Sequence, residues 1–96
     1  MLNLGLIGCG KMGAALLKGV STALEGRETL RVTLCDTVPA AIKSLRESLS
    51  VETSAGSPAQ VAASSDVVLL ALKPQDMKPL CETLTQVRGQ RLYLSL

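Results

Sequence analysis

The chain has 96 residues, which is the length of one domain rather than two. Its net charge of +2 and its single aromatic residue, Tyr93, argue against a nucleic-acid-binding surface. Hydrophobic residues make up 47% of the sequence, but no run approaches the roughly 20 apolar residues that a membrane-spanning helix needs. We therefore expect one globular domain, residues 1–96, that binds neither nucleic acid nor membrane.

The first 24 residues read as a strand, a glycine-rich turn and a helix. Leu2–Ile7 is apolar and strand-like, and a helix is expected from Lys11 to Ala23 or Leu24. Its apolar pattern is formed by Met12, Leu16, Gly19, Val20 and Ala23.

The turn carries the spacing G-x-G-x-x-G, in which each glycine meets a separate physical need. Gly8 allows a sharp exit from the strand with positive φ. Gly10 leaves room for a pyrophosphate close to the backbone, and Gly13 lets the helix pack tightly on the strand. The helix N-terminus then faces the phosphates, and its dipole favours their charge. A glycine-rich turn in an unrelated α/β domain is the alternative.

A second strand, Leu30–Cys35, ends at Asp36, which lies 23 residues beyond Gly13. A carboxylate at this distance from the glycines accepts hydrogen bonds from the adenosine ribose hydroxyls of a dinucleotide. Asp36 or Thr37 is alternatively a cap of the next helix, in which Pro39 fits the first turn.

The rest of the chain continues the alternation of helices and strands. The apolar positions of the second helix are Ala41, Ile42, Leu45 and Leu49. A short strand at Val51–Thr53 precedes a turn and a brief helix, Pro58–Ala63, which Ser57 caps. The continuous apolar run Val67–Leu72 is typical of a central parallel strand. A last helix follows and ends near Gly89; its apolar positions are Met77, Leu80, Cys81, Leu84 and Val87. The last strand is expected at Arg91–Leu96.

This order predicts an α/β fold of the Rossmann type. Right-handed crossovers give a doubly wound parallel sheet of about five strands in the order 3-2-1-4-5, with helices on both faces. The apolar last strand would be an open edge, so we expect it to meet a continuation of the chain or a partner.

The three cysteines, Cys9, Cys35 and Cys81, have no metal-like spacing, and the chain has no histidine. We expect no metal site and interpret all three as buried small hydrophobes. Free thiols favour a reducing, cytoplasmic setting.

Two segments resemble the N-terminal domain of pyrroline-5-carboxylate reductase: GLIGCGKMGAALLKGV (Gly5–Val20) and SDVVLLALKPQ (Ser65–Gln75). That family has an I-G-x-G-N-M-G turn and a fourth strand that reads A-D-V-V-x-L-A-V-K-P. RLYLSL at the end of the chain is similar to the family's L-V-V-S-I, so the likeness spans the whole chain.

The resemblance implies an oxidoreductase of proline biosynthesis that uses NAD(P)H to reduce the cyclic imine pyrroline-5-carboxylate to proline. Ala71, Leu72, Lys73 and Pro74 would lie beside the ribose and nicotinamide. The residues that would hold the pyrophosphate are Ile7, Gly8, Cys9, Gly10, Lys11, Met12 and Gly13. The family's helical C-terminal domain, which forms a homo-oligomer and most of the substrate pocket, is absent from these residues. No catalytic residue is predicted here.

Three positions depart from the family pattern. Lys11 replaces a usual Asn, and Ser57-Pro58 stands where many members carry an Asn near the adenosine. Asp36 stands where many members that prefer NADPH carry small or polar residues, and a carboxylate repels a 2′-phosphate. The chain is therefore expected to prefer NADH.

Two other functions share these sequence features. Related cofactor domains occur in 6-phosphogluconate- and hydroxyisobutyrate-type dehydrogenases and in F420-dependent NADP reductases. A nucleotide-sensing module without catalysis is the third interpretation.

Overall fold

The computed structural model describes residues 1–27, 29–49 and 51–95, and these residues contain five strands and four helices. The strands are β1 (Leu2–Ile7), β2 (Leu30–Cys35), β3 (Glu52–Ala55), β4 (Val67–Leu70) and β5 (Leu92–Ser95). The helices are α1 (Lys11–Leu24), α2 (Pro39–Ser48), α3 (Pro58–Ser64) and α4 (Pro74–Leu84).

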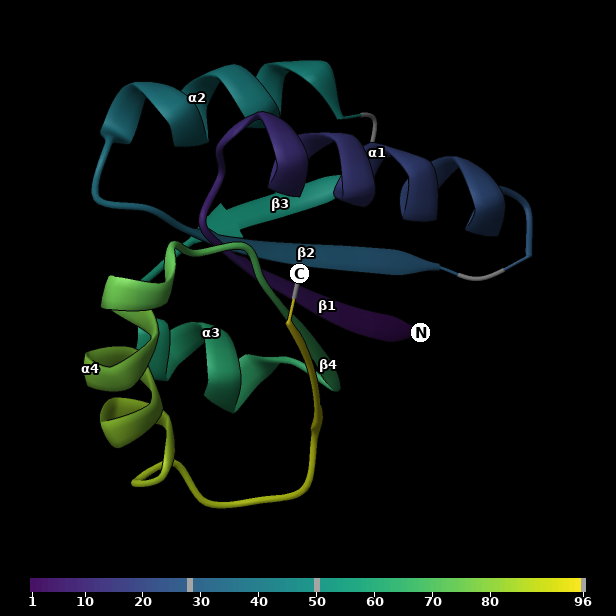
Figure 1. The fold of residues 1–96 in the computed structure, drawn as a ribbon. Helices are drawn as coiled ribbons and strands as arrows, with labels where there is room; N and C mark the ends of the chain where they lie inside the picture. The colour runs from purple at the N-terminus through teal and green to yellow at the C-terminus, as the bar shows by residue number, and fades with distance from the viewer. Residues whose placement is uncertain (28, 50, 96) are drawn as a thin grey trace.

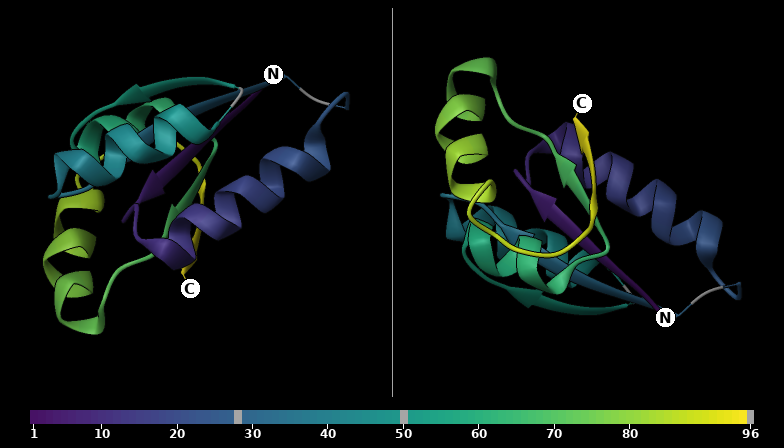
Figure 2. Two further views of the ribbon diagram at one scale, coloured as in Figure 1. Left: turned by 90° about the horizontal axis from the view of Figure 1, so that it is seen from above. Right: turned by 90° about the horizontal axis from the view of Figure 1, so that it is seen from below.

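All strand pairs are parallel and the sheet order is β3-β2-β1-β4-β5, which confirms the predicted topology. Helices α1 and α2 cover one face of the sheet, and α3 and α4 cover the other (Figure 1). The two views of Figure 2 show these helix layers from above and below. The carboxyl ends of the strands therefore point to one edge, where ligands of such sheets bind.

The central strands β1 and β4 are buried on both faces, because each contributes side chains to two hydrophobic clusters. In β1, Leu4 and Leu6 belong to the cluster under α1 and α2, while Ile7 belongs to the cluster under α3 and α4. In β4, Leu69 faces the first cluster and Val68 faces the second. This two-sided burial explains why both strands read as continuous apolar runs.

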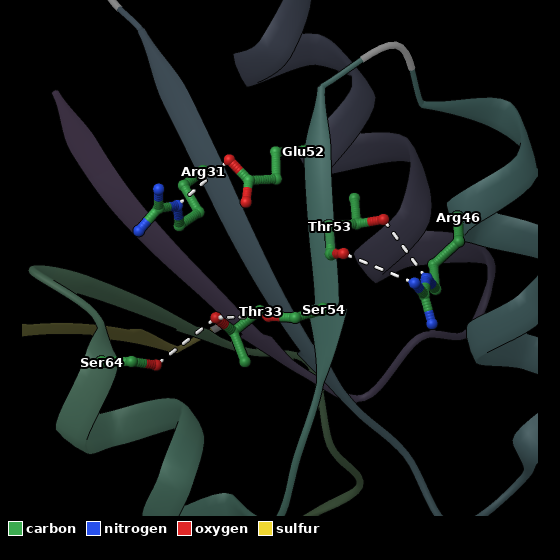
Figure 3. Close-up of polar contacts among 7 residues, drawn as sticks. All are labelled: Arg31, Thr33, Arg46, Glu52, Thr53, Ser54 and Ser64. Carbon is green, nitrogen blue, oxygen red and sulfur yellow. Dashed lines mark hydrogen bonds and ion pairs between the residues drawn. The ribbon is translucent and has the colours of Figure 1, made fainter.

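Strands β2 and β3 have one polar face, which Figure 3 shows. Arg31 pairs with Glu52 across the strands at 3.3 Å, and Thr33 contacts both Ser54 and Ser64. These exposed contacts contribute little free energy individually. They lie near the edge of the sheet, where α3 reaches β2 through Ser64 but leaves Arg31 and Glu52 exposed.

Several predicted boundaries are corrected. Strand β3 reaches Ala55, which was expected in a turn, and β4 ends at Leu70 rather than Leu72. Helix α4 ends at Leu84, well before Gly89. Strand β5 occupies Leu92–Ser95, while residue 96 of the predicted last strand lies outside the described residues.

The buried face of α1 differs from the predicted pattern. Gly13 and Leu17 are its buried residues, whereas Met12 is 69% exposed and Gly19 and Ala23 are also exposed. Only Leu16 and Val20 of the predicted set pack against the core. Packing on the sheet therefore does not account for the apolar side chain of Met12, although Gly13 and Ala14 of the same turn do pack inward.

Candidate functional site

The glycine-rich loop leaves β1 between the ends of its two neighbours. Gly8 has φ +99°, and its N–H donates to the carbonyl oxygen of Cys35 at 2.8 Å. The N–H of Ala71 donates to the carbonyl oxygen of Ile7 at 2.9 Å. A Cβ at Gly8 would overlap the carbonyl of Ala71, so this position requires glycine for both its dihedral and its space.

Gly13 and Gly10 meet opposite requirements. A Cβ at Gly13 would overlap the carbonyl oxygen of Gly8 and crowd the side chains of Ala71 and Leu6, so α1 packs against the loop itself. A Cβ at Gly10 would have nothing within 4 Å, so the space in front of this residue is open. Gly10 is the N-cap of α1, and no side chain caps that helix end. Its first-turn N–H groups therefore lack a side-chain acceptor and face an open space.

Asp36 is tied to the same loop. One carboxylate oxygen accepts a hydrogen bond from the Cys9 N–H at 2.6 Å, and the other accepts from the Val38 N–H at 2.9 Å. The N-cap of α2 is Val38, without a side-chain bond, so the prediction that Asp36 or Thr37 caps this helix is wrong. Pro39 does occupy the first turn, as predicted. The half-buried carboxylate of Asp36 instead fastens the glycine-rich loop to the end of β2.

The other predicted site residues lie around this loop with different exposures. Lys11 and Met12 begin α1 and are exposed, and Lys73 and Pro74 begin α4 and are exposed as well. Leu72 is half-buried and packs against the cluster under α3 and α4. The structure thus brings Ile7, Gly8, Gly13 and Ala71 into direct contact, with the four exposed residues at the rim.

A cleft of about 350 Å³ opens beside this loop on the side of α3 and α4. Its walls include Asp36 and Thr37 after β2, Leu72 after β4, and residues of two helices. The helix residues are Pro58, Asp76, Pro79, Leu80 and Thr83. None of these five is among the predicted cofactor-binding residues. The four residues of α4, from Asp76 to Thr83, have the spacing i, i+3, i+4, i+7, which places those four on one helical face and is the sequence signal that could have identified them.

Two thiols at this edge are protonated at neutral pH. Burial, together with the charge of Asp36 and then the neighbouring Cys35, raises the pKa of Cys9 to about 12. Burial and the charge of Asp36 also raise the pKa of Cys35. Cys9 and Cys35 are buried, as predicted, but Cys81 is exposed, so the expectation for that residue is wrong. The buried pair therefore act as packing groups rather than nucleophiles.

None of the helices in residues 1–27, 29–49 and 51–95 is long and apolar enough to cross a membrane. Within the same ranges, no three side chains of His, Cys, Asp or Glu gather where they could hold a metal ion.

The geometry therefore fits a dinucleotide. The open backbone at Gly10 and the uncapped start of α1 suit a pyrophosphate, and the carboxylate that follows β2 suits the hydroxyls of an adenosine ribose. The fold and this edge define a nicotinamide-dinucleotide-binding domain of the Rossmann class. The chain belongs to the family described as NADP oxidoreductase, coenzyme F420-dependent, whose model matches residues 3–96.

Individual relatives are pyrroline-5-carboxylate reductases. The chain is 26% identical to the enzyme of Kluyveromyces lactis and 28% identical to that of Methanosarcina acetivorans, with 98% of this chain covered in both. It spans 39% and 34% of the length of these two proteins.

The solved structure of a pyrroline-5-carboxylate reductase from Coxiella burnetii is also similar. It superposes with a TM-score of 0.78 at 28% identity, covering 99% of this chain and 35% of that one. An imine reductase from Myxococcus stipitatus shares the fold, with a TM-score of 0.71 at 22% identity, covering 100% of this chain and 32% of that one. The chain is thus a nucleotide-binding domain of an oxidoreductase family and resembles pyrroline-5-carboxylate reductase.

Proposed function

We propose that the chain binds the pyrophosphate of a nicotinamide dinucleotide over Ile7–Gly13, with the adenosine ribose at Asp36. The open space at Gly10, in front of the uncapped N-terminus of α1, is the observation that carries this proposal. Backbone N–H groups and the helix dipole stabilise phosphate charge at such a position. The exposed side chain of Lys11 adds a positive charge at the same helix end.

The adenosine is proposed to occupy the cleft beside the loop. The cleft combines apolar walls, including Pro58, Pro79 and Leu80, with polar side chains such as Asp36 and Thr37. A purine ring has two apolar faces, while its ribose hydroxyls need acceptors, so a cleft with both kinds of wall suits a nucleoside. Ala71, Leu72, Lys73 and Pro74, at the end of β4, would then lie toward the ribose and nicotinamide, with Leu72 at the boundary because it also lines the cleft.

Asp36 favours NADH over NADPH in this proposal. Each of its oxygens accepts one backbone hydrogen bond and retains a lone pair for a ribose hydroxyl. A 2′-phosphate would place like charges next to each other. A hydrogen bond to a charged group contributes about 1.5–3 kcal/mol, which is roughly ten- to hundredfold in affinity.

In a protein of the relatives' size, we propose that this domain serves a cytoplasmic imine reductase that converts 1-pyrroline-5-carboxylate to proline. The bound nicotinamide supplies the hydride, and the residues of this domain bind and orient the dinucleotide. A further C-terminal domain would provide the substrate pocket and the homo-oligomer interface. The similarity to the two curated reductases, over 98% of this chain, supports this proposal.

A second candidate comes from the family model, whose description names coenzyme F420. In that case the domain would serve hydride transfer between NADP and a deazaflavin. The two candidates differ in dinucleotide preference, since the second requires a 2′-phosphate to be tolerated beside Asp36. A chain that binds NADPH more tightly than NADH would therefore favour the second candidate.

The test is a pair of calorimetric titrations of the folded chain with NADH and NADPH. Gly10→Val is expected to abolish measurable binding of both dinucleotides, because the side chain would fill the open space without touching the protein. Gly19→Val is the matched control, since its Cβ also meets nothing within 4 Å and the residue lies further along α1. Equal binding by the wild type and a folded Gly10→Val variant would refute the pyrophosphate site.

The preference for NADH is tested separately with Asp36→Asn. The ratio of NADPH to NADH dissociation constants is expected to fall by about tenfold or more, because the repulsion of the 2′-phosphate is removed. Asn has only one oxygen acceptor, so the variant loses one of the two hydrogen bonds that Asp36 accepts from Cys9 and Val38. If the loop loosens as a result, the affinities for both dinucleotides fall together, and only their ratio reports on the preference. An unchanged ratio would restrict Asp36 to its structural role.

A further inference from the structure

The cleft beside the glycine-rich loop is acidic. Of the residues that line it, Asp36 and Asp76 carry charge, and both are negative. Its other walls are apolar or carry hydroxyl groups, as at Thr37 and Thr83. A group with a negative charge that entered this cleft would therefore meet two carboxylates and no lysine or arginine among the lining residues.

The two carboxylates are held differently. Asp36 accepts two backbone hydrogen bonds, from Cys9 and Val38. Asp76 is exposed in the first turn of α4, and its carboxylate has no hydrogen-bond or ion-pair partner among the described residues. Lys73 and Lys78 flank it along the chain, but neither lines the cleft. The charge of Asp76 is therefore available to a ligand.

From this arrangement we infer that Asp76 is a second specificity-determining residue, which acts with Asp36 to exclude a nucleotide phosphorylated on its adenosine ribose. The inference rests on the proposed placement of adenosine in the cleft. A dinucleotide with a free ribose gains or loses little from the charge of Asp76. A 2′-phosphate adds close to two negative charges, which repel a carboxylate even across several ångströms of solvent.

A purely structural role of Asp76 has a different signature. A carboxylate in the first turn of a helix interacts favourably with the helix dipole and so stabilises the helix. Loss of that interaction would lower the midpoint of thermal unfolding and leave the ratio of two ligand affinities unchanged. The ratio therefore separates the specificity role from the helix-terminal role.

The experiment compares Asp76→Asn with the wild type, using adenosine 5′-diphosphate and adenosine 2′,5′-bisphosphate as probes in calorimetric titrations at low ionic strength. The variant is expected to bind the bisphosphate about two- to tenfold more tightly and the diphosphate equally well. This gain should shrink in about 0.5 M NaCl, because salt screens exposed charges beyond a few ångströms. Glu82→Gln is the control, since it removes the same charge from the same helix at a residue that does not line the cleft.

Each outcome has one meaning. An unchanged ratio in Asp76→Asn, or an equal gain in Glu82→Gln, would overturn the specificity role. Equal weakening of both probes would also overturn it, because Asp76 would then support the base rather than select against the phosphate. If the wild type binds neither probe nor NADH, the placement of the nucleotide itself is wrong, which is a separate failure of the proposed function.

Discussion

Asp36 connects three segments at the edge of the sheet. Its carboxylate bonds to the loop at Cys9 and to Val38, which precedes α2, and the residue itself directly follows β2. The distance of Asp36 from the glycines predicts only one role for its carboxylate, which is to bind the ribose of the ligand. The hydrogen bond to the loop depends on how β1 and β2 lie in register, which no local pattern contains.

The exposed thiol of Cys81 is expected to react with iodoacetamide before the other two cysteines. The thiolate is the nucleophile, and the raised pKa values of Cys9 and Cys35 keep both buried thiols protonated near pH 7.5. Mass spectrometry of the native chain should find one label, on Cys81, until the protein unfolds.

The same reaction in a denaturant provides the control for this prediction. All three cysteines should then be labelled at similar rates, because burial no longer raises any pKa. Modification of Cys9 in the native chain as fast as Cys81 would show that the loop opens readily in solution.

At the scale of elements, α1 carries two glycines with opposite surroundings. Gly13→Ala is expected to destabilise the fold by about 1–3 kcal/mol, since its Cβ would press on the loop carbonyl of Gly8. Gly19→Ala is expected to stabilise it by roughly 0.5–1 kcal/mol, because a helical glycine in open space has excess unfolded-state entropy. Urea unfolding measures both free energies, and changes of the same sign would contradict the packing of α1.

Helix α4 shows why an apolar pattern can overestimate an element. Val87 continues the helical spacing and packs against the core, yet it lies in turns that follow Leu84. The N–H of Val87 bonds to the carbonyl oxygen of Leu84 at 3.1 Å. Side-chain burial therefore persists after the helix has ended, and periodicity reports burial rather than backbone geometry.

Strand β4 illustrates the same limit at a functional edge. Its hydrogen bonding to β1 extends to the N–H of Ala71, but the strand itself ends at Leu70. Leu72 turns toward the cluster under α3 and α4. A continuous apolar run predicts one strand, but this run continues past the strand into the segment before α4, where Leu72 still packs on the core.

For the whole molecule, the sheet order could be predicted because alternating elements and right-handed crossovers leave few topologies. The glycine-rich loop could also be located, because its glycine spacing directly follows the first predicted strand. The cleft could not, because it forms only where α4 meets the end of β2, far apart in the chain. Asp76 therefore entered the candidate site through tertiary structure and not through any motif.

The buried thiols also link the stability of the whole fold to pH. In Cys9 the folded pKa of about 12 exceeds the ordinary value of 9.0, and the pKa of Cys35 is raised as well. Below pH 9 the thiols are protonated in both the folded and the unfolded chain. Their contribution to the free energy of unfolding is then at its maximum and does not change with pH. Above pH 9 the unfolded chain releases protons that the folded chain retains, so the free energy of unfolding falls as pH rises.

We therefore expect the free energy of unfolding, measured with urea, to fall between pH 9 and 12, by at most about 1.4 kcal/mol per pH unit from the Cys9 thiol. Cys9→Ala is expected to flatten this slope, because it removes a thiol whose pKa is raised in the folded chain. Comparison of the two slopes cancels other groups that titrate in this range, which both proteins share. Identical slopes would mean that the Cys9 thiol ionises as easily in the folded chain as in the unfolded one, and that solvent reaches the base of the glycine-rich loop.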